Sequence, residues 1–227
     1  MRIGAIIPAA GQGKRMEKDI NKQYLQLLDR PLLAHTLDKF SNNTKIDQIV
    51  TVVRKDEMEY CQEQILKKYD FNNVKLVAGG ETRQQSVYAG LMAFSPAINY
   101  VIIHDGARPL LSKKLLDKVL NNLGKYEALT TGVPIKDTVK IVDDEHFVKE
   151  TLNRSYLSSI QTPQAFNYDL ICKAHESYKG NLKATDDASL VEAMGHKVKI
   201  IKGEYSNIKV TTPIDLVYAE SILKKKR

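Results

Sequence analysis

The sequence predicts an α/β fold with a mainly parallel central sheet flanked by helices. Short apolar runs without polar alternation recur along the chain, as expected for strands that are buried on both faces. Between them lie segments with the spacing of amphipathic helices, such as Val87, Leu91 and Phe94 at positions i, i+4 and i+7. This alternation of strand and helix is typical of a parallel sheet covered by helices. The strand-like runs are 3–7, 49–53, 74–77, 100–103 and 198–201.

Length and composition indicate one large globular domain. The chain has 227 residues, of which 43% are hydrophobic and 27% are charged, so we expect a single domain over residues 1–227. No apolar run approaches the roughly 20 residues that span a bilayer, and the apolar stretch at the N-terminus is too short for a signal peptide. The two cysteines, Cys61 and Cys172, stand in helix-like contexts and exclude a disulfide scaffold or a cysteine-based zinc site. We therefore expect a soluble cytoplasmic protein without a membrane partner.

The formal net charge is +7, and much of the excess lies in residues 224–227. Such a cluster has two interpretations, a solvated helix end whose cations complement the dipole or a patch that binds nucleic acid. We favour the first, because few aromatic residues are interleaved and Trp is absent. No nucleic-acid partner is expected.

Helix-end signals mark two helices near the C-terminus. Thr212 and Asp215 bracket Pro213 in the pattern of an N-cap, a first-turn proline and a first-turn acid. Gly195 is expected to end a helix that starts near Thr185. Leucines and valine over 115–123 indicate a further helix earlier in the chain.

One stretch, residues 132–157, breaks the alternation of strand and helix. Apolar residues alternate with polar ones as far as Ile141, the acidic segment 143–146 interrupts, and the apolar pattern resumes at Phe147. This pattern predicts a β-hairpin. Because an extended hairpin often leaves the body of a domain and finds a partner, we expect a protruding arm at about 132–157 that contacts a partner.

The segment after the first strand-like run, residues 8–16, reads PAAGQGKRM. Gly11 and Gly13 free the backbone to turn tightly and approach a ligand. Amide groups in such a loop at a helix N-terminus bind phosphate oxygens, and Arg15 and Lys22 add positive charge. We interpret the segment as a phosphate-binding turn, and an ordinary glycine-rich turn remains the alternative.

Two well-known phosphate motifs do not fit this segment. A dinucleotide fingerprint needs glycine at position 16, which is Met16. A P-loop built on Gly13 and Lys14 would need glycine at position 8 and serine or threonine at position 15, where the chain has Pro8 and Arg15.

Two later strand-like runs end in segments of the same kind, 78–86 (AGGETRQQS) and 104–109 (HDGARP). Because ligands of open α/β sheets bind outside the carboxyl ends of the strands, the three segments are expected to share one crevice. Asp105 would there be a carboxylate able to bind Mg²⁺, and Arg108 could bind a phosphate group. A local ion pair that fixes the loop is the alternative.

The remaining candidates are less informative. Lys209, just before the last helix, would be another strand-end cation, although most lysines are simply solvated. His104 is interpreted as a loop-positioning residue rather than a base. Thr138 and Arg154 would face each other across the hairpin only in one register. No nucleophile elbow and no histidine cluster for zinc is present in the sequence.

In their order along the chain, these segments resemble the sugar-phosphate nucleotidyltransferases and, among them, the 2-C-methyl-D-erythritol 4-phosphate cytidylyltransferase family of the non-mevalonate isoprenoid pathway. The resemblance runs from about Ile3 to Leu223. It is carried by Pro8-Ala9-Ala10-Gly11-x-Gly13-x-Arg15-Met16, Lys22-Gln23-Tyr24, Gly79-Gly80-x-x-Arg83-x-x-Ser86-Val87, His104-Asp105-x-Ala107-Arg108-Pro109, Val133-Pro134-x-Lys136-Asp137-Thr138, Gln161-Thr162-Pro163-Gln164, Thr185-Asp186 and Asn207-Ile208-Lys209-Val210-Thr211.

This resemblance implies a Rossmann-like nucleotidyltransferase fold and a homodimer built on the 132–157 arm. It implies transfer of CMP from CTP to 2-C-methyl-D-erythritol 4-phosphate in the bacterial cytoplasm, with Mg²⁺ held mainly by the CTP phosphates and Asp105 as a candidate metal ligand. The implied catalytic residues are Arg15, Lys22 and Lys209. The implied nucleotide-binding residues are Pro8, Ala9, Ala10, Gly11, Gly13, Gly80, Glu81, Ser86 and Ala107. The implied acceptor-binding residues are Asp105, Arg108, Thr138, Arg154 and Thr162, with Thr138 and Arg154 reaching over from the partner subunit.

The ribitol-5-phosphate cytidylyltransferase group is the nearest alternative, and it shares the first loop, the Gln-Thr-Pro-Gln stretch and the Asn-Ile-Lys segment. It usually differs at positions equivalent to Ala10, 86–87 and 137–138. The chain also departs from the methylerythritol family: Asn21 replaces a usual proline, Gly106 a usual alanine, and Glu81 a common aspartate. None of these departures removes a charged group assigned to the chemistry. A catalytically silent nucleotide-binding module is a third possibility, disfavoured by the retained cations.

Overall fold

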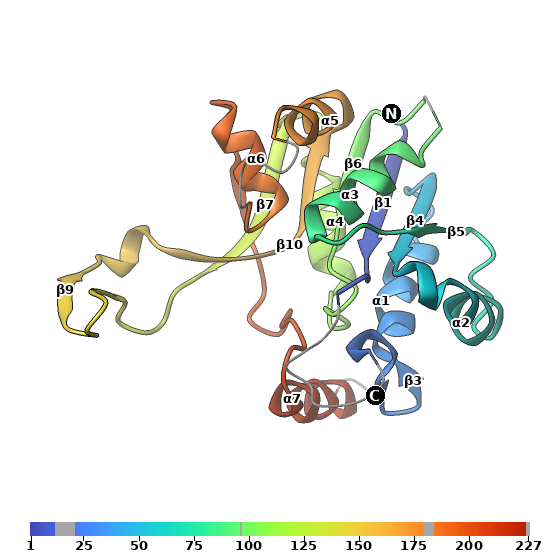
Figure 1. The fold of residues 1–227 in the computed structure, drawn as a ribbon, viewed down its shortest axis with the longest axis horizontal. Coiled ribbons are helices and arrows are strands. Elements are labelled where there is room, and N and C mark those ends of the chain that lie inside the picture. The colour runs from blue at the N-terminus through green and yellow to red at the C-terminus, as the bar shows by residue number, and fades with distance from the viewer. Residues whose placement is uncertain (12–20, 96, 179–183, 226–227) are drawn as a thin grey trace.

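The structure is a computed structural model that describes residues 1–11, 21–95, 97–178 and 184–225 (Figure 1). Its centre is a seven-stranded sheet in the order β11-β7-β10-β6-β1-β4-β5, in which only β10 runs antiparallel to its neighbours. The mainly parallel sheet expected from the sequence is therefore confirmed. The strands are β1 Ile3–Pro8, β4 Gln48–Val53, β5 Val74–Ala78, β6 Tyr100–Ile103, β7 Ala128–Pro134, β10 Ser158–Asn167 and β11 Lys199–Lys202.

Helices cover both faces of the sheet, as the apolar strands require. One buried cluster joins β1 to α1, to α2 with the π-helix η4, and to α4. The cluster on the other face joins β1 and β4 to α3, α5 and α6. The helices in the described part of the chain are α1 Leu32–Ser41, α2 Met58–Cys61, η4 Gln62–Lys67, α3 Arg83–Met92, α4 Lys113–Leu120, α5 Tyr168–Ser177, α6 Asp187–Ala193 and α7 Pro213–Lys224. Short 3-10 turns there are η2 Lys22–Tyr24, η3 Lys55–Glu57 and η5 Arg154–Tyr156.

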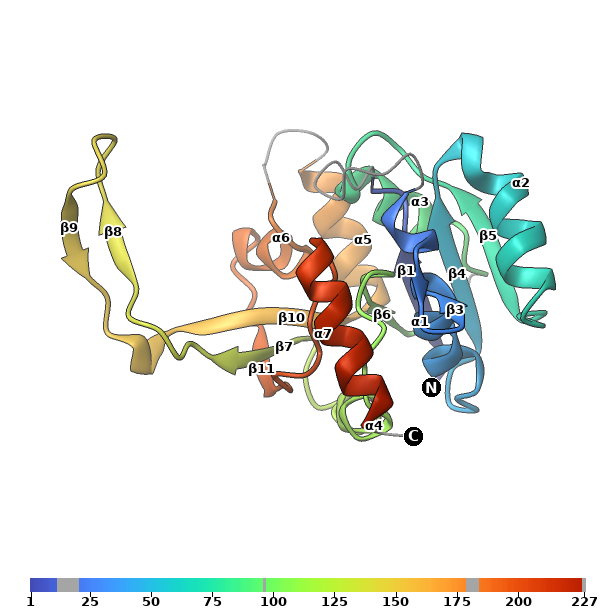
Figure 2. The ribbon, with the colours of Figure 1, turned by 90° about the horizontal axis from the view of Figure 1, so that it is seen from below.

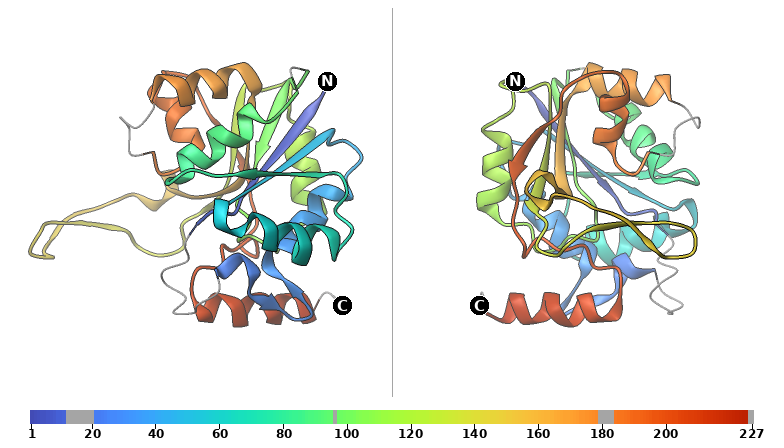
Figure 3. Two further views of the ribbon diagram at one scale, coloured as in Figure 1. Left: turned by 45° about the vertical axis from the view of Figure 1, so that its right-hand side comes forward. Right: turned by 90° about the vertical axis from the view of Figure 1, so that its left-hand side faces the viewer.

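The last helix, α7, packs outside the two main layers. It lies against the small hairpin of β2 Gln26–Leu27 and β3 Arg30–Pro31, as both views of Figure 3 show. A third buried cluster, with Leu27, Leu110 and Ala219 among its members, fills the space between them. Asp215 Oδ2 accepts a hydrogen bond from Thr212 N at 2.9 Å, which confirms the expected capping pattern.

The helix ends agree with the expected signals. Gly195, at φ +83°, follows the end of α6, and its N–H donates to Glu192 O at 2.8 Å. The helix α6 starts at Asp187, close to the expected Thr185, and the Asp186 side chain caps it by accepting from Ser189 N. Within the described residues, no helix is long and apolar enough to cross a membrane.

The hairpin expected at 132–157 projects from the body of the domain (Figures 1 and 2). Its outer part is the antiparallel pair of β8 Lys140–Val142 and β9 Val148–Thr151. Its base continues from β7 and β10, which pair antiparallel within the central sheet. The strand β10 was not expected, because Gln161, Pro163 and Gln164 interrupt any apolar run. The pairing register of β10 with β7 shifts between Gln161 and Gln164.

Candidate active site

A cleft of about 710 Å³ opens at the carboxyl ends of β1, β4, β5 and β6. The cleft is lined by residues from all three segments that were expected to share one crevice, within 8–11, 79–86 and 105–107. Residues that follow β4 and residues that precede α7 line it as well. The sequence-predicted site residues on its wall are Pro8, Ala9, Ala10, Gly11, Gly80, Glu81, Ser86, Asp105, Ala107 and Lys209.

The other predicted site residues are not among the described residues that line the cleft. Gly13 and Arg15 lie outside the described residues, and so does the side chain of Lys22. Thr138 and Arg154 are exposed on the arm, where the Arg154 guanidinium donates to Lys136 O at 2.7 Å. The structure of one chain thus does not bring these two residues to the cleft.

Close backbone approach shapes the floor of the cleft. The Ala9 N–H donates to Val52 O at 2.7 Å, so the chain after β1 continues along β4 before it turns. A Cβ at Gly79 would lie 2.6 Å from Ser86 Oγ and 3.0 Å from Ala10 Cβ. Only glycine at position 79 therefore lets the two loops meet without displacement.

Gly106, the departure from the family noted above, is also closely packed. Its N–H donates to Pro8 O at 3.1 Å, and an added Cβ would lie 3.2 Å from both Ala9 Cβ and Leu33 Cδ1. Glycine in place of the usual alanine thus allows the loop after β6 to pack tightly against the loop after β1.

A capping box fixes the loop that leads into α3. Thr82 is the N-cap and accepts from Gln85 N at 3.1 Å, while Gln85 Oε1 accepts from Glu81 N at 2.8 Å. The Ser86 hydroxyl donates back to Thr82 O at 2.9 Å. The positive end of the α3 dipole is thereby held at the wall of the cleft, which favours a bound anion.

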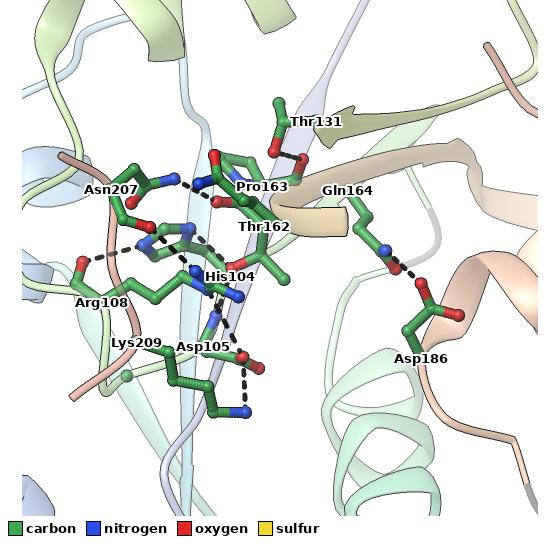
Figure 4. A network of polar contacts seen from close by, with 12 residues as sticks. His104, Asp105, Arg108, Thr131, Thr162, Pro163, Gln164, Asp186, Asn207 and Lys209 are labelled. Atoms are coloured by element: carbon green, nitrogen blue, oxygen red, sulfur yellow. Dashed lines mark hydrogen bonds and ion pairs between the residues drawn. The ribbon is translucent and has the colours of Figure 1, made fainter. Parts of the chain in front are cut away.

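Asp105 is the centre of the charged part of the site (Figure 4). Its carboxylate lies 2.8 Å from Lys209 Nζ, 3.3 Å from Arg83 Nε and 3.7 Å from Arg108 Nε. Burial alone would raise the pKa of the Asp105 carboxyl, but the charges of Arg83, Lys209 and Arg108 outweigh it and hold this pKa well below its usual range. Asp105 is therefore a fixed anion surrounded by cations.

A buried network behind Asp105 fixes its backbone. The Asp105 N–H donates to Thr162 Oγ1 at 3.0 Å, and this hydroxyl lies 3.1 Å from His104 Nδ1. His104 Nε2 lies 3.1 Å from Arg108 O, so the hydrogen-bond network assigns the proton to Nε2 and makes the Thr162 hydroxyl the donor to Nδ1. Burial lowers the pKa of His104 to about 4, which keeps the ring neutral and supports its interpretation as a positioning residue.

Arg108 belongs to this supporting network as well. Its Nη1 donates to Asn207 O at 2.8 Å, and the Asn207 amide donates to Thr162 O at 2.7 Å. Burial lowers the pKa of the Arg108 guanidinium, although nearby Asp105 opposes this effect. Arg108 and Thr162 are not among the residues that line the cleft; they connect the Asp105 loop to the segment that carries Lys209.

Sequence reasoning missed several residues on the cleft wall. Arg54, Lys55 and Asp56 follow β4 and line the cleft, where the Arg54 guanidinium binds the Asp56 carboxylate through two hydrogen bonds. They could have been predicted, because they follow the strand-like run 49–53 and ligands of open α/β sheets bind outside the carboxyl ends of the strands. Arg83 belongs to one of the motifs that carry the family resemblance, but no function was predicted for it. Its position in the sequence does not indicate that its side chain contacts Asp105.

The metal-binding capacity of the cleft is limited. Among the described residues, no group of three or more His, Cys, Asp and Glu side chains could hold a metal ion. Of the described residues, Asp56, Glu81 and Asp105 are the carboxylates that line the cleft, and Asp56 is paired with Arg54. These carboxylates fit a Mg²⁺ ion that is bound by one carboxylate of the protein together with phosphate groups of a bound ligand.

The helix-covered parallel sheet, the tight glycine-containing turns and the cationic cleft at the strand ends define an α/β nucleotide-binding protein. The profile of the 2-C-methyl-D-erythritol 4-phosphate cytidylyltransferase family matches residues 3–225. The chain belongs to this family.

Individual relatives support the assignment over nearly the whole length. A 2-C-methyl-D-erythritol 4-phosphate cytidylyltransferase of Clostridium novyi is 48% identical over 222 residues, which cover 97% of this chain and 96% of that protein. That of Clostridioides difficile is 44% identical over 223 residues, or 98% and 94% of the two chains. The crystal structure of 4-diphosphocytidyl-2C-methyl-D-erythritol synthase from Anaerococcus prevotii has a TM-score of 0.87 at 44% identity, covering 98% of this chain and 96% of that one.

Proposed function

We propose that the protein transfers CMP from CTP to 2-C-methyl-D-erythritol 4-phosphate, with release of pyrophosphate, as a step of non-mevalonate isoprenoid precursor synthesis. The products are 4-diphosphocytidyl-2-C-methyl-D-erythritol and pyrophosphate. The observation that carries the proposal is the family match over residues 3–225, which includes the whole cleft wall. The relatives named for this activity also disfavour ribitol 5-phosphate as the acceptor.

The reaction is an in-line substitution at the α-phosphorus of CTP. An oxygen of the acceptor phosphate forms the new P–O bond, and the bond between the α-phosphorus and the bridging oxygen of the pyrophosphate breaks. Because a phosphate monoester is already largely ionised, no strong general base is required. Catalysis then consists of positioning and charge stabilisation, as in other phosphoryl transfers. This chemistry suits a cleft rich in cations.

The two substrates are assigned to two parts of the cleft. The 8–11 turn, extended by Gly13, and Ala107 contact the CTP phosphates, while Gly80, Glu81 and Ser86 contact the cytosine and ribose. Arg15, Lys22 and Lys209 hold the triphosphate and the charge that develops on it. The support for Lys209 is its position on the cleft wall beside Asp105.

Asp105 binds the acceptor, since its carboxylate is the buried anion on the cleft wall and can accept hydrogen bonds from polyol hydroxyl groups. Arg108 and Thr162 support the acceptor site from behind through the contacts described above. Mg²⁺, when bound with CTP, would be held by the nucleotide phosphates together with Asp105 and would neutralise part of the triphosphate charge.

The active enzyme is a homodimer in this proposal, formed through the 132–157 arm. Phe147, Val148 and Tyr156 on the arm are 67%, 59% and 87% exposed, an apolar surface that a second copy would cover. Thr138 and Arg154 then reach the acceptor site of the partner. Light scattering at micromolar concentration tests this, with a dimeric mass expected; a monomeric mass would contradict it.

We further propose that residues 1–227 form one domain of a cytoplasmic bacterial enzyme. The activity is tested by mass spectrometry of a reaction with CTP, Mg²⁺ and 2-C-methyl-D-erythritol 4-phosphate. One equivalent of the diphosphocytidyl product and one of pyrophosphate are expected. Binding of CTP without formation of either product would contradict the proposed activity and would indicate a catalytically silent nucleotide-binding module.

A further inference from the structure

A chain of buried charged groups leads away from the cleft into the domain. The Arg83 guanidinium stands between two carboxylates, with Nε 3.3 Å from Asp105 Oδ1 and Nη2 2.7 Å from Asp187 Oδ2. The other oxygen of Asp187 lies 3.3 Å from His175 Nε2. Three helices thus contribute to one chain of contacts that ends at Asp105: α3 with Arg83, α6 with Asp187 and α5 with His175.

Burial makes this arrangement rigid. The side chains of Asp187 and His175 are 1% and 0% exposed, whereas Arg83 is 30% exposed and lines the cleft. A buried carboxylate is strongly destabilising unless a cation pairs with it, so Asp187 holds the guanidinium in place. Burial would raise the pKa of the Asp187 carboxyl, but Arg83 outweighs it and lowers this pKa.

Asp187 is itself held by backbone contacts. It is the first residue of α6, and its N–H donates to Gln164 Oε1 at 3.2 Å. Gln164 Nε2 donates to Thr130 Oγ1 at 2.9 Å and to Asp186 Oδ2 at 2.7 Å, the latter contact being drawn in Figure 4. These contacts attach the start of α6 to β7 and β10, so the position of the Asp187 backbone is fixed relative to the sheet.

We propose that Asp187 is a positioning residue that acts through Arg83 on Asp105 and so sets the orientation of the acceptor-binding carboxylate. Asp187 holds Nη2 of the guanidinium through the ion pair at 2.7 Å, and Nε–H donates to Asp105 Oδ1 at 3.3 Å. The planar fork of arginine can donate to two carboxylates at once, whereas the compact ammonium of lysine cannot span both. The inference rests on the proposed acceptor role of Asp105.

The test is steady-state kinetics of four variants with each substrate varied against saturation by the other. Asp187→Asn keeps the side-chain volume and removes the charge. The KM for 2-C-methyl-D-erythritol 4-phosphate should then rise about 10-fold to 100-fold, by analogy with the loss when the hydrogen-bonding partner of a metal ligand is removed. The KM for CTP should stay within about twofold. Arg83→Lys should behave in the same way.

The double variant Arg83→Lys with Asp187→Asn separates positioning from general damage. If Asp187 acts through Arg83, the two effects on the acceptor KM should not multiply, and the double variant should match the worse single one. A matched control is Asp38→Asn, which breaks the Arg30–Asp38 pair at 3.0 Å outside the cleft and should leave both KM values unchanged.

An unchanged acceptor KM in Asp187→Asn, or effects of the two substitutions that multiply, would overturn the inference. If Asp187→Asn does not fold, Arg83→Lys decides: a raised acceptor KM supports the inference and an unchanged one refutes it. The fourth variant, Asp105→Asn, tests the underlying proposal. An unchanged acceptor KM there refutes the role of Asp105, whereas a rise there with none in Asp187→Asn refutes the positioning role alone.

Discussion

Replacing Lys209 by Gln is expected to slow turnover without unfolding the protein. Asp105 would keep Arg83 and Arg108 as cationic partners, so its carboxylate stays ionised and the loop stays in place. The loss is therefore one cation on the cleft wall. A unit charge about 4 Å from another contributes about 4 kcal/mol at an effective dielectric constant of about 20.

Solvent reduces this value, because the Lys209 side chain is 37% exposed. We expect about 2–3 kcal/mol of lost transition-state stabilisation, which corresponds to a kcat lowered by roughly 30-fold to 150-fold. The assay is the rate of pyrophosphate release with CTP and 2-C-methyl-D-erythritol 4-phosphate both saturating. Circular dichroism should show the same fold as in the unsubstituted protein.

The control for this prediction is Lys67→Gln, which removes a lysine that pairs with Glu63 at 2.6 Å on a helix outside the cleft. Its kcat should be unchanged. A kcat of Lys209→Gln within twofold of the unsubstituted enzyme would refute the catalytic role of Lys209.

Three other predictions concern the remaining assignments. Lys22→Ala should lower kcat by about 10²-fold to 10³-fold with the fold retained, as for removal of one preorganised charge-stabilising group; near-normal turnover would remove Lys22 from the mechanism. Arg154→Ala should raise the acceptor KM far more than the CTP KM, and equal effects on both would argue against its acceptor role. His104 has a folded-state pKa of about 4, below its usual value of about 6.5, so the unfolded chain binds more protons between these values and stability should fall as the pH drops from 6.5 to 4. The free energy of unfolding from urea titrations should lose about 3 kcal/mol over this window, and a His104→Gln variant with an equally steep loss would refute this cause.

The sequence contains enough information to predict the parallel strands and the edge of the sheet where the site lies. Continuous apolar runs such as 49–53 are typical of strands buried on both faces, and the structure places a strand at each predicted run. The antiparallel strand β10 was missed because Pro163 interrupts it and because Gln161 and Gln164 make side-chain hydrogen bonds instead of extending an apolar face. Local patterns carry no signal for such tertiary roles.

The candidate site, like the fold, was predicted in part from the sequence. Strand-end positions predicted that Asp105 would lie near the glycine-rich turn, and both line one cleft. Lys209 lines the same cleft, but only the family resemblance indicated this. That Thr162 faces the backbone of Asp105, or that Arg83 joins Asp105 to Asp187, depends on contacts between residues 22 or more positions apart. Such contacts follow from packing, which one sequence does not reveal.

A comparison of two acceptors in the same assay tests the proposed acceptor. Initial rates of pyrophosphate release are measured with CTP and Mg²⁺, using 2-C-methyl-D-erythritol 4-phosphate or ribitol 5-phosphate. The proposed function predicts a kcat/KM strongly in favour of 2-C-methyl-D-erythritol 4-phosphate. An equal or higher kcat/KM for ribitol 5-phosphate would contradict the proposed acceptor and pathway while leaving the CTP site in place.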